Sequence, residues 1–311
     1  MTQYQHFHTH PTAPAYRLPP GSCDSQFHVF GPADRYPVRP GAAYEMPDAT
    51  IETALGLHRL LGIERGVIVQ ATTYGADHQV VLDGLAAAGP SYRGCANAVV
   101  LAERDDAYIQ KLHDAGVRGV RFNFVKRLVD RLDTGALERI VEKIAPLGWH
   151  VVIYFEADDL PELYDFFSAI PTDVVVDHMG RPDVTKDVDG PEFGLFLRFL
   201  RENPNVWTKV SCPERLSAEG PPALDGQQHA YRDVVPFARR VVEEFPGRVL
   251  WGTDWPHPNL KDHMPDDGLL VDYLPQIAPT ADLQRRLLVD NPTRLYWPDG
   301  SDEPGRSDEG A

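Results

Sequence analysis

The chain has 311 residues, of which 42% are hydrophobic and 24% are charged, a composition typical of folded globular proteins. Its 46 acidic residues outnumber its 30 basic residues and give a formal net charge of −16, which disfavours a nucleic-acid partner. No apolar run approaches the ~20 residues of a membrane span, and the first residues have no apolar core of a secretory signal. Three cysteines without a CxxC spacing argue against a disulfide framework and a thiolate zinc site. We therefore expect a cytoplasmic protein without a membrane partner.

The two ends of the chain differ from the rest. Residues 1–20 are polar and proline-rich, and residues 298–311 are charged and rich in glycine and proline. Both patterns predict short flexible arms. No shift of composition divides residues 21–297, so this segment is predicted to form one domain.

Short apolar runs alternate with helical patterns between the two arms. The runs are rich in β-branched residues, as is typical of buried parallel strands. They lie at 23–30, 66–72, 94–100, 117–124, 151–156, 174–179, 206–211 and 249–254. Helical patterns fit 49–61, 77–88, 103–115, 135–147, 159–167, 193–200, 234–242 and 281–290. Eight β-then-α units predict an α/β fold with a single (β/α)8 TIM-type barrel.

Polar side chains end nearly every predicted strand. In a (β/α)8 barrel the active site lies at these carboxy-terminal strand ends. Any one such residue could simply satisfy a loop backbone, but a whole set at one mouth indicates a functional site. The set consists of Gln26, His28, Thr72, Thr73, Arg121, Tyr154, Glu156, Asp177, His178, Ser211, Arg215 and Asp254.

Asp254 is the strongest catalytic candidate. It follows the last predicted strand in the segment GTDWPHP, and a positioned carboxylate there can deprotonate water. The alternative is a helix-capping role. His28 and His178, from the first and sixth strands, could bind a metal or polarise a carbonyl, or they could be buried structural histidines.

Three arginines stand out in this acidic chain. Arg121, Arg127 and Arg215 fall at or just beyond strand ends, and guanidinium groups bind carboxylates with two hydrogen bonds. They predict a substrate with two or more carboxylates, unless they form internal salt bridges. The segment 213–228 is long and marked by glycine and proline, which fits a lid or a surface loop. His6, His8 and His10 resemble a metal cluster, but they lie in the predicted arm, so no metal role is assigned to them.

Several longer stretches resemble a known family. They are GVRGVRFNFVKRLVD at 116–130, GWHVVIYFEADDLPEL at 148–163, KVSCPERLS at 209–217 and LWGTDWPHPNLKDHMPDDGLL at 250–270. Together with VDHMGRP and a first strand that ends in His28, they resemble the amidohydrolase superfamily and its metal-independent lactonase branch. The resemblance runs from about Cys23 to Pro298.

The resemblance implies an activity and a set of site residues. It implies hydrolysis of the lactone ring of 2-pyrone-4,6-dicarboxylate to 4-carboxy-2-hydroxymuconate, in the catabolism of lignin-derived aromatics, without a metal or another cofactor. It implies that Asp254 activates water and that His28 and His178 stabilise the oxyanion. The partner is then a small lactone with two or three carboxylates. The implied substrate-binding residues are Tyr44, Thr72 or Thr73, Arg121, Arg127, Tyr154, Arg215 and Asn259, to which we add the amide of Gln26.

Gln26 departs from the family pattern. The superfamily has His-x-His at the end of the first strand, and Gln26 occupies the first of these positions. An amide is a poor zinc ligand beside imidazole, although it can donate a hydrogen bond. Two alternatives stay open: a zinc-dependent lactonase or amidohydrolase with Glu156, His28, His178 and Asp254 as ligands, and a barrel that binds polycarboxylates without catalysis. The sequence does not predict an oligomeric state.

Overall fold

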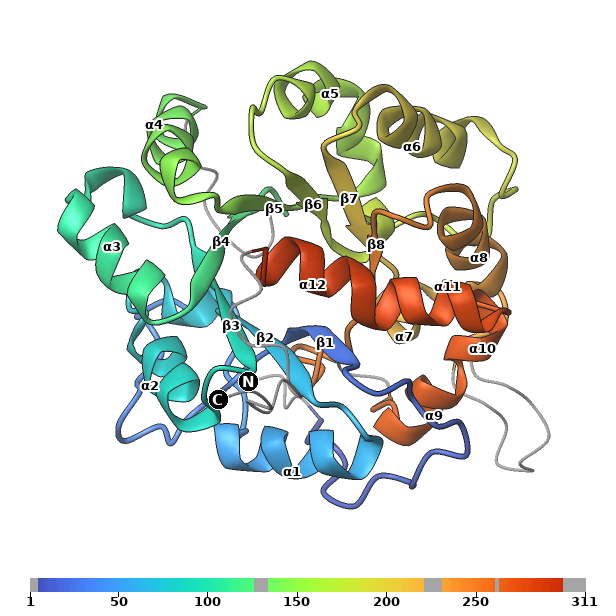
Figure 1. Ribbon diagram of the computed structural model, residues 1–311, viewed down its shortest axis with the longest axis horizontal. Coiled ribbons are helices and arrows are strands. Elements are labelled where there is room, and N and C mark those ends of the chain that lie inside the picture. Colours follow the sequence, from blue (N-terminus) through green and yellow to red (C-terminus); the bar gives the residue numbers. More distant parts are fainter. Residues whose placement is uncertain (1–4, 126–133, 221–230, 261–262, 299–311) are drawn as a thin grey trace, which may run out of the picture.

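Eight strands form one parallel sheet in which every strand pairs with its neighbour in the sequence (Figure 1). The computed structural model describes residues 5–125, 134–220, 231–260 and 263–298. The strands are β1 (Cys23–Phe27), β2 (Arg65–Val69), β3 (Tyr92–Asn97), β4 (Val117–Asn123), β5 (His150–Tyr154), β6 (Val174–Val176), β7 (Val206–Lys209) and β8 (Val249–Leu250). The predicted (β/α)8 barrel is confirmed. All eight strands end one to four residues earlier than predicted.

Helices surround this sheet and connect its strands (Figure 1). They are α1 (Ile51–Leu61), α2 (Gln79–Ala88), α3 (Asp106–Asp114), α4 (Thr134–Ile144), α5 (Leu160–Ser168), α6 (Pro191–Glu202), α7 (Pro213–Leu216), α8 (Val235–Glu244), α9 (Asp267–Asp272), α10 (Leu274–Ile277), α11 (Ala281–Arg285) and α12 (Asn291–Tyr296). Single 3-10 turns lie at Thr72–Tyr74, Leu101–Glu103, Ala145–Leu147 and Ala157–Asp159, and a π-helical turn at Arg286–Asp290 joins α11 to α12. No helix in the described ranges is long and apolar enough to span a membrane.

The barrel closes where the chain beyond β8 meets β1. Ser25 N donates to Trp251 O at 2.9 Å, and Asp254 N donates to Gln26 O at 2.7 Å. Gly252 permits this approach, because a Cβ atom there would lie 2.5 Å from both the Cβ and the backbone nitrogen of Gln26. The register of β1 against β2 shifts between Asp24 and Phe27. We attribute to this irregularity the fact that Gln26 and His28 both reach the chain that follows β8.

The interior of the barrel has an apolar cluster at one end. It contains Cys23, Val67, Val69, Cys95, Val152, Val175, Trp207 and Leu250, with Leu295, Tyr296 and Trp297 from the last helix and the residue after it. In Figure 1, α11 and α12 run across the barrel end that faces the viewer. His150, at the start of β5, packs edge-on against Tyr296. Burial lowers the pKa of His150 to about 3, so this histidine is an uncharged member of the core.

The amino-terminal segment lies against the barrel near β8. The ring of Phe7 is buried and packs edge-on against Trp255, with 4.9 Å between the ring centroids. Thr12 donates from its backbone nitrogen and its hydroxyl to the carboxylate of Asp266, which also caps α9. The flexibility predicted for residues 1–20 stays a prediction. Of the predicted carboxy-terminal arm, residues 299–311 lie outside the described residues.

The contact at Gly252 generates a stability prediction. We expect Gly252→Ala to lower the free energy of unfolding by about 1–3 kcal/mol, because the new methyl group must push β1 away. Gly194→Ala in α6 is the matched control, since a Cβ there meets nothing within 4 Å, and it should stabilise the helix by ~0.5–1 kcal/mol. Urea unfolding of both variants measures the difference. Equal effects would show that the β1–β8 contact tolerates a side chain.

Candidate active site

A pocket opens at the carboxy-terminal ends of the strands. Its wall contains most of the residues that the sequence predicts for a site. They are His28, Tyr44, Thr72, Arg121, Tyr154, His178, Arg215, Asp254 and Asn259, together with Pro258. Gln26 and Thr73 are buried and are not in the wall. Arg127 lies outside the described residues.

Backbone conformations at this end of the barrel are unusual. Of the nine non-glycine residues with positive φ in the described ranges, seven lie within nine residues after the end of β6, β7 or β8. They are His178, Met179, Arg181, Cys212, Asp254, His257 and Asn259. Such conformations cost energy and concentrate at functional sites, where the surrounding structure enforces them.

Asp254 is held in its left-handed conformation, with φ of 60°, by its neighbour and by β1. Thr253 donates from its hydroxyl to Asp24 at 2.6 Å and from its backbone nitrogen to the same carboxylate at 3.0 Å. Asp24 also accepts from the backbone nitrogen of Gln26. One buried carboxylate thereby fixes the chain on both sides of the barrel closure, and the side chain of Asp254 points toward the pocket.

The carboxylate of Asp254 is surrounded by donors. Its Oδ1 lies 3.3 Å from the amide nitrogen of Gln26 and 3.2 Å from Nε2 of His28, while Oδ2 accepts from Nε and Nη2 of Arg215 at 3.2 and 3.1 Å. Burial by itself would raise the pKa of Asp254, but Arg215 and His28 hold it well below its usual value. Asp254 is therefore ionised at neutral pH.

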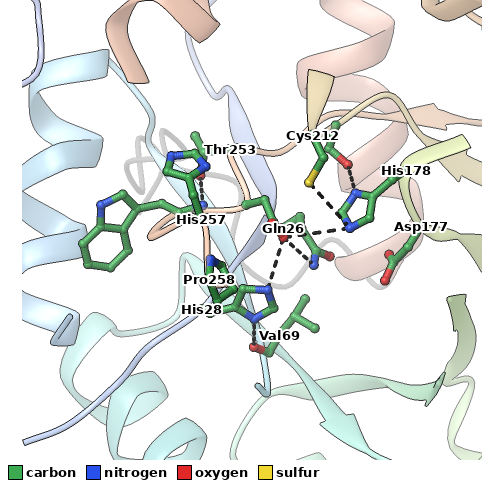
Figure 2. A network of polar contacts seen from close by, with 12 residues as sticks. Gln26, His28, Val69, Asp177, His178, Cys212, Thr253, His257 and Pro258 are labelled. Carbon is green, nitrogen blue, oxygen red and sulfur yellow. Dashed lines mark hydrogen bonds and ion pairs between the residues drawn. The ribbon is translucent and has the colours of Figure 1, made fainter. Parts of the chain in front are cut away.

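The two site histidines approach Asp254 from different strands. Figure 2 shows the rings of His28 and His178 on different sides of the Gln26 side chain. Nδ1 of His28 donates to Val69 O at 2.7 Å, so this ring is fixed with Nε2 toward Asp254. Nδ1 of His178 lies 2.7 Å from the hydroxyl of Ser211, and its Nε2 lies 4.0 Å from Asp254. Burial lowers the pKa of His178 to about 4, so this ring is neutral at pH 7.

A chain of buried charges runs from Arg121 to Gln26. Nε and Nη2 of Arg121 both lie 2.7 Å from Oδ2 of Asp177. Oδ1 of Asp177 accepts from Nζ of Lys209 at 3.1 Å, and the same ammonium donates to Oε1 of Gln26 at 2.6 Å. Burial would raise the pKa of Asp177, but Lys209 and Arg121 lower it to about 2. The guanidinium of Arg121 also lies 4.7 Å from the ring centroid of Tyr154.

A second buried network contacts Arg215. Glu214 lies 3.7 Å from Nε of Arg215 and 3.6 Å from Nδ1 of His257. The other ring nitrogen of His257 contacts Asp267 at 3.2 Å. Burial would lower the pKa of His257, but the carboxylates of Asp267 and Glu214 raise it to about 10. An imidazolium at His257 therefore connects α7, α9 and the loop after Asp254.

His178, Cys212 and Asp254 place possible metal-ligand atoms within 4.8 Å of one another. This trio does not fit a divalent cation well. Both oxygens of Asp254 already accept hydrogen bonds, and the guanidinium of Arg215 contacts the same carboxylate. Burial also raises the pKa of Cys212 well above its usual value, which keeps the thiol protonated. We therefore assign no step to a metal ion.

Several residues that the sequence singled out lie elsewhere. Glu156, a ligand in the zinc alternative, is exposed and lies outside the trio. His6, His8 and His10 belong to no ligating group among the described residues. Only residues 213–220 of the predicted lid are described, and they contain α7.

Sequence reasoning missed the roles of Lys209 and His257. Lys209 is a charged residue within an apolar strand, where it alternates with Thr208 and lies on the same face as Trp207. That position alone could have marked it as an inward-pointing cation. His257 stands in the GTDWPHP segment, but no pattern in the sequence shows its partner Asp267.

The chain belongs to the amidohydrolase family, whose sequence model matches residues 6–297. Comparisons with individual proteins point to lactone hydrolases within that family. The chain is 63% identical to the 2-pyrone-4,6-dicarboxylate hydrolase of Comamonas testosteroni over 293 residues, which cover 94% of this chain and 95% of the relative. It is 37% identical to the 4-sulfomuconolactone hydrolase of Hydrogenophaga intermedia, over 90% of this chain and 89% of the relative.

A solved structure shares both the fold and part of the sequence. It is the crystal structure of a probable 2-pyrone-4,6-dicarboxylic acid hydrolase from Acinetobacter baumannii with citric acid bound. The two structures match with a TM-score of 0.74 and 25% sequence identity. The match covers 89% of this chain and 99% of the other.

The His257 network generates a prediction for stability against pH. Because the folded pKa of about 10 lies above the usual value of 6.5, the stabilisation is complete below pH 6.5 and is lost as the pH rises toward 10. We expect His257→Gln to remove roughly 3–5 kcal/mol at pH 6 and much less at pH 10. Urea unfolding at a series of pH values measures this difference.

His78→Gln is the control for this prediction. His78 is also buried, but burial lowers its pKa to about 4, so it is neutral throughout the range. Its substitution should shift stability by a constant amount between pH 6 and 10. A constant shift for His257→Gln as well would contradict the charged state of that histidine.

Proposed function

We propose that this protein hydrolyses the lactone ring of 2-pyrone-4,6-dicarboxylate to 4-carboxy-2-hydroxymuconate without a metal ion. The observation that carries the proposal is an ionised, buried Asp254 in a pocket whose wall also holds two histidines and the guanidinium groups of Arg121 and Arg215. The 63% identity to a hydrolase of this compound supports the choice of substrate. The three free, buried cysteines fit a reducing compartment, and we place the reaction in the cytoplasm.

The carboxylates of the substrate bind to the cationic and hydroxyl groups of the wall. Arg121 and Tyr154 lie together on one side, and Arg215 and Asn259 belong to the chain after β7 and β8. Tyr44 shares a hydrogen bond with Thr72, and both residues line the same pocket. We assign Arg127 to the same set of substrate-binding residues on the resemblance alone. Two fixed guanidinium groups match a dianion and orient its ring.

Arg215 couples substrate binding to the strength of the base. In the free protein both of its contacts with Asp254 go to Oδ2. A substrate carboxylate competes for this guanidinium and weakens that ion pair. Burial then dominates the environment of Asp254 and raises its pKa toward a value suited to proton transfer. The base gains strength only when the lactone is in place.

Asp254 then takes a proton from water while the water oxygen bonds to the lactone carbonyl carbon. The oxyanion that forms is stabilised by His28 and by His178. We place the proton of His178 on Nε2, so that Nδ1 accepts a hydrogen bond from the hydroxyl of Ser211. The bond between the carbonyl carbon and the ring oxygen breaks, and the ring oxygen receives the proton from Asp254. The leaving group is a conjugated enol, which departs more readily than an alkoxide, so this mechanism does not need a Lewis acid.

The first experiment follows the ultraviolet absorbance of 2-pyrone-4,6-dicarboxylate mixed with metal-stripped protein. We expect the pyrone band to disappear at an enzymatic rate, with kcat of about 1–10³ s⁻¹. Hydrolysis that begins only after zinc is restored would overturn metal independence and select the zinc-dependent alternative. Binding by calorimetry without hydrolysis in either condition would select the non-catalytic polycarboxylate-binding barrel.

Two substitutions separate the role of Asp254 in proton transfer from the role of Arg215 in substrate binding. Asp254→Asn should lower kcat by about 10²–10⁴-fold with a small change in KM, because it removes the general base. Arg215→Met should raise KM by about 10–100-fold and move the acid limb of the kcat/KM profile, which reports the free protein, to higher pH, because Arg215 no longer offsets the burial of Asp254. Steady-state kinetics between pH 4 and 9 measure both effects. Near wild-type turnover by Asp254→Asn would exclude Asp254 as the base.

A further inference from the structure

Lys209 is a fully buried cation that the mechanism above does not use. It is the last residue of β7, and none of its surface is exposed. A buried ammonium is costly unless its hydrogen bonds are satisfied. Nζ has two acceptors, Oε1 of Gln26 at 2.6 Å and Oδ1 of Asp177 at 3.1 Å.

The contact with Lys209 fixes which way the Gln26 amide points. An ammonium only donates, so the amide must present its oxygen to Lys209. Its nitrogen then faces Oδ1 of Asp254 at 3.3 Å as a donor. A flipped amide would place two donors against each other at Lys209 and two acceptors against each other at Asp254. Gln26 is thus an oriented link between a buried cation and the catalytic carboxylate.

The second acceptor, Asp177, connects Lys209 to the substrate-binding residue Arg121. Asp177 uses Oδ1 for Lys209 and Oδ2 for Arg121, whose guanidinium lies in the pocket wall. Without the ammonium, Asp177 would have only Arg121 as a cationic hydrogen-bond partner, and its carboxylate would be free to rotate. The position of Arg121 therefore depends on Lys209 through one intermediate.

We infer that Lys209 is the positioning residue of this site, which orients the donor to Asp254 through Gln26 and holds Arg121 toward the pocket through Asp177. The kinetic part of this inference rests on the proposed lactone hydrolysis. It also gives Gln26 a role other than substrate contact, which agrees with its absence from the pocket wall.

The experiment separates the link from Lys209 through Gln26 to Asp254 from the link through Asp177 to Arg121, by their effects on kcat and KM. Gln26→Glu keeps an oxygen acceptor for Lys209 but replaces the donor to Asp254, so we expect kcat to fall by about 10–100-fold with KM within about twofold. Lys209→Met should lower kcat by a similar factor and also raise KM by about tenfold, because Arg121 loses its support. In the double variant the two losses of kcat should not multiply, since both remove the same link.

Arg65→Met is the matched control. Arg65 is a buried cation near the opposite end of the barrel, where it donates to Gly21 O and to the hydroxyl of Thr293. Its substitution should lower the melting temperature and leave kcat and KM within about twofold of wild type. If Lys209→Met behaves in the same way, its role is structural and the inference is overturned. If Lys209→Met does not fold, wild-type kcat in Gln26→Glu would overturn the inference on its own.

A binding measurement keeps the inference apart from the proposed reaction. Benzene-1,3-dicarboxylate carries two carboxylates in the same 1,3 relation as the pyrone and has no lactone to open. In calorimetry we expect Lys209→Met to weaken its binding by about tenfold and Gln26→Glu to change it by less than twofold. This contrast holds or fails whether or not the wild-type protein hydrolyses the pyrone, and equal Kd values for wild type and Lys209→Met would refute the link to Arg121.

Discussion

The backbone hydrogen bond from Asp254 to Gln26 joins the end of the barrel to its beginning, and it is short at 2.7 Å. This contact requires a residue without a side chain at Gly252. It places the Gln26 and His28 side chains beside a carboxylate that follows the last strand. The carboxylate of Asp254, its amide donor and one histidine therefore come together only when the first and last strands are joined.

In the part of the chain that the structure describes, the buried ions around the pocket lie beside opposite charges. Among the described residues of the network, Lys209, Arg121 and Arg215 are cations, and Asp177 and Asp254 are carboxylates. With Glu214, His257 and Asp267 of the second network, the buried cations and carboxylates are equal in number. The pocket wall itself holds the guanidinium groups of Arg121 and Arg215 and the carboxylate of Asp254, so an anionic substrate meets two cations there in a chain whose formal net charge is −16. The same cations make the pocket a poor place for an additional divalent metal.

Much of this arrangement follows from the sequence, and the reasons are physical. Apolar runs of strand length alternate with helical patterns, which defines the barrel, and the strand-end rule then brings His28, Arg121, His178 and Asp254 to one mouth. Tyr44 and Asn259 could not be found in this way, because they lie in loops; only the resemblance to lactonases indicated them.

The remaining features depend on partners that no periodicity reveals. The alternation of a strand shows that Lys209 faces inward, but it does not show that the ammonium lies between Gln26 and Asp177. The irregularity in β1 changes which residues face the interior, and it leaves no mark in composition. The contacts of Phe7 with Trp255 and of Thr12 with Asp266 join a polar, proline-rich segment to residues near the other end of the chain, and local composition gives no sign of these partners.

These long-range contacts also determine when the site can form during synthesis. Thr12 and Asp266 are 254 positions apart, and Gln26 and Asp254 are 228 positions apart. The first strand and the amino-terminal segment leave the ribosome long before their partners are made, so both must wait for the last part of the chain. Until then β1 has one unpaired edge, and the side chains of Gln26 and His28 lack their partner Asp254. A nascent chain can therefore assemble most of its hydrophobic core before it possesses any catalytic centre.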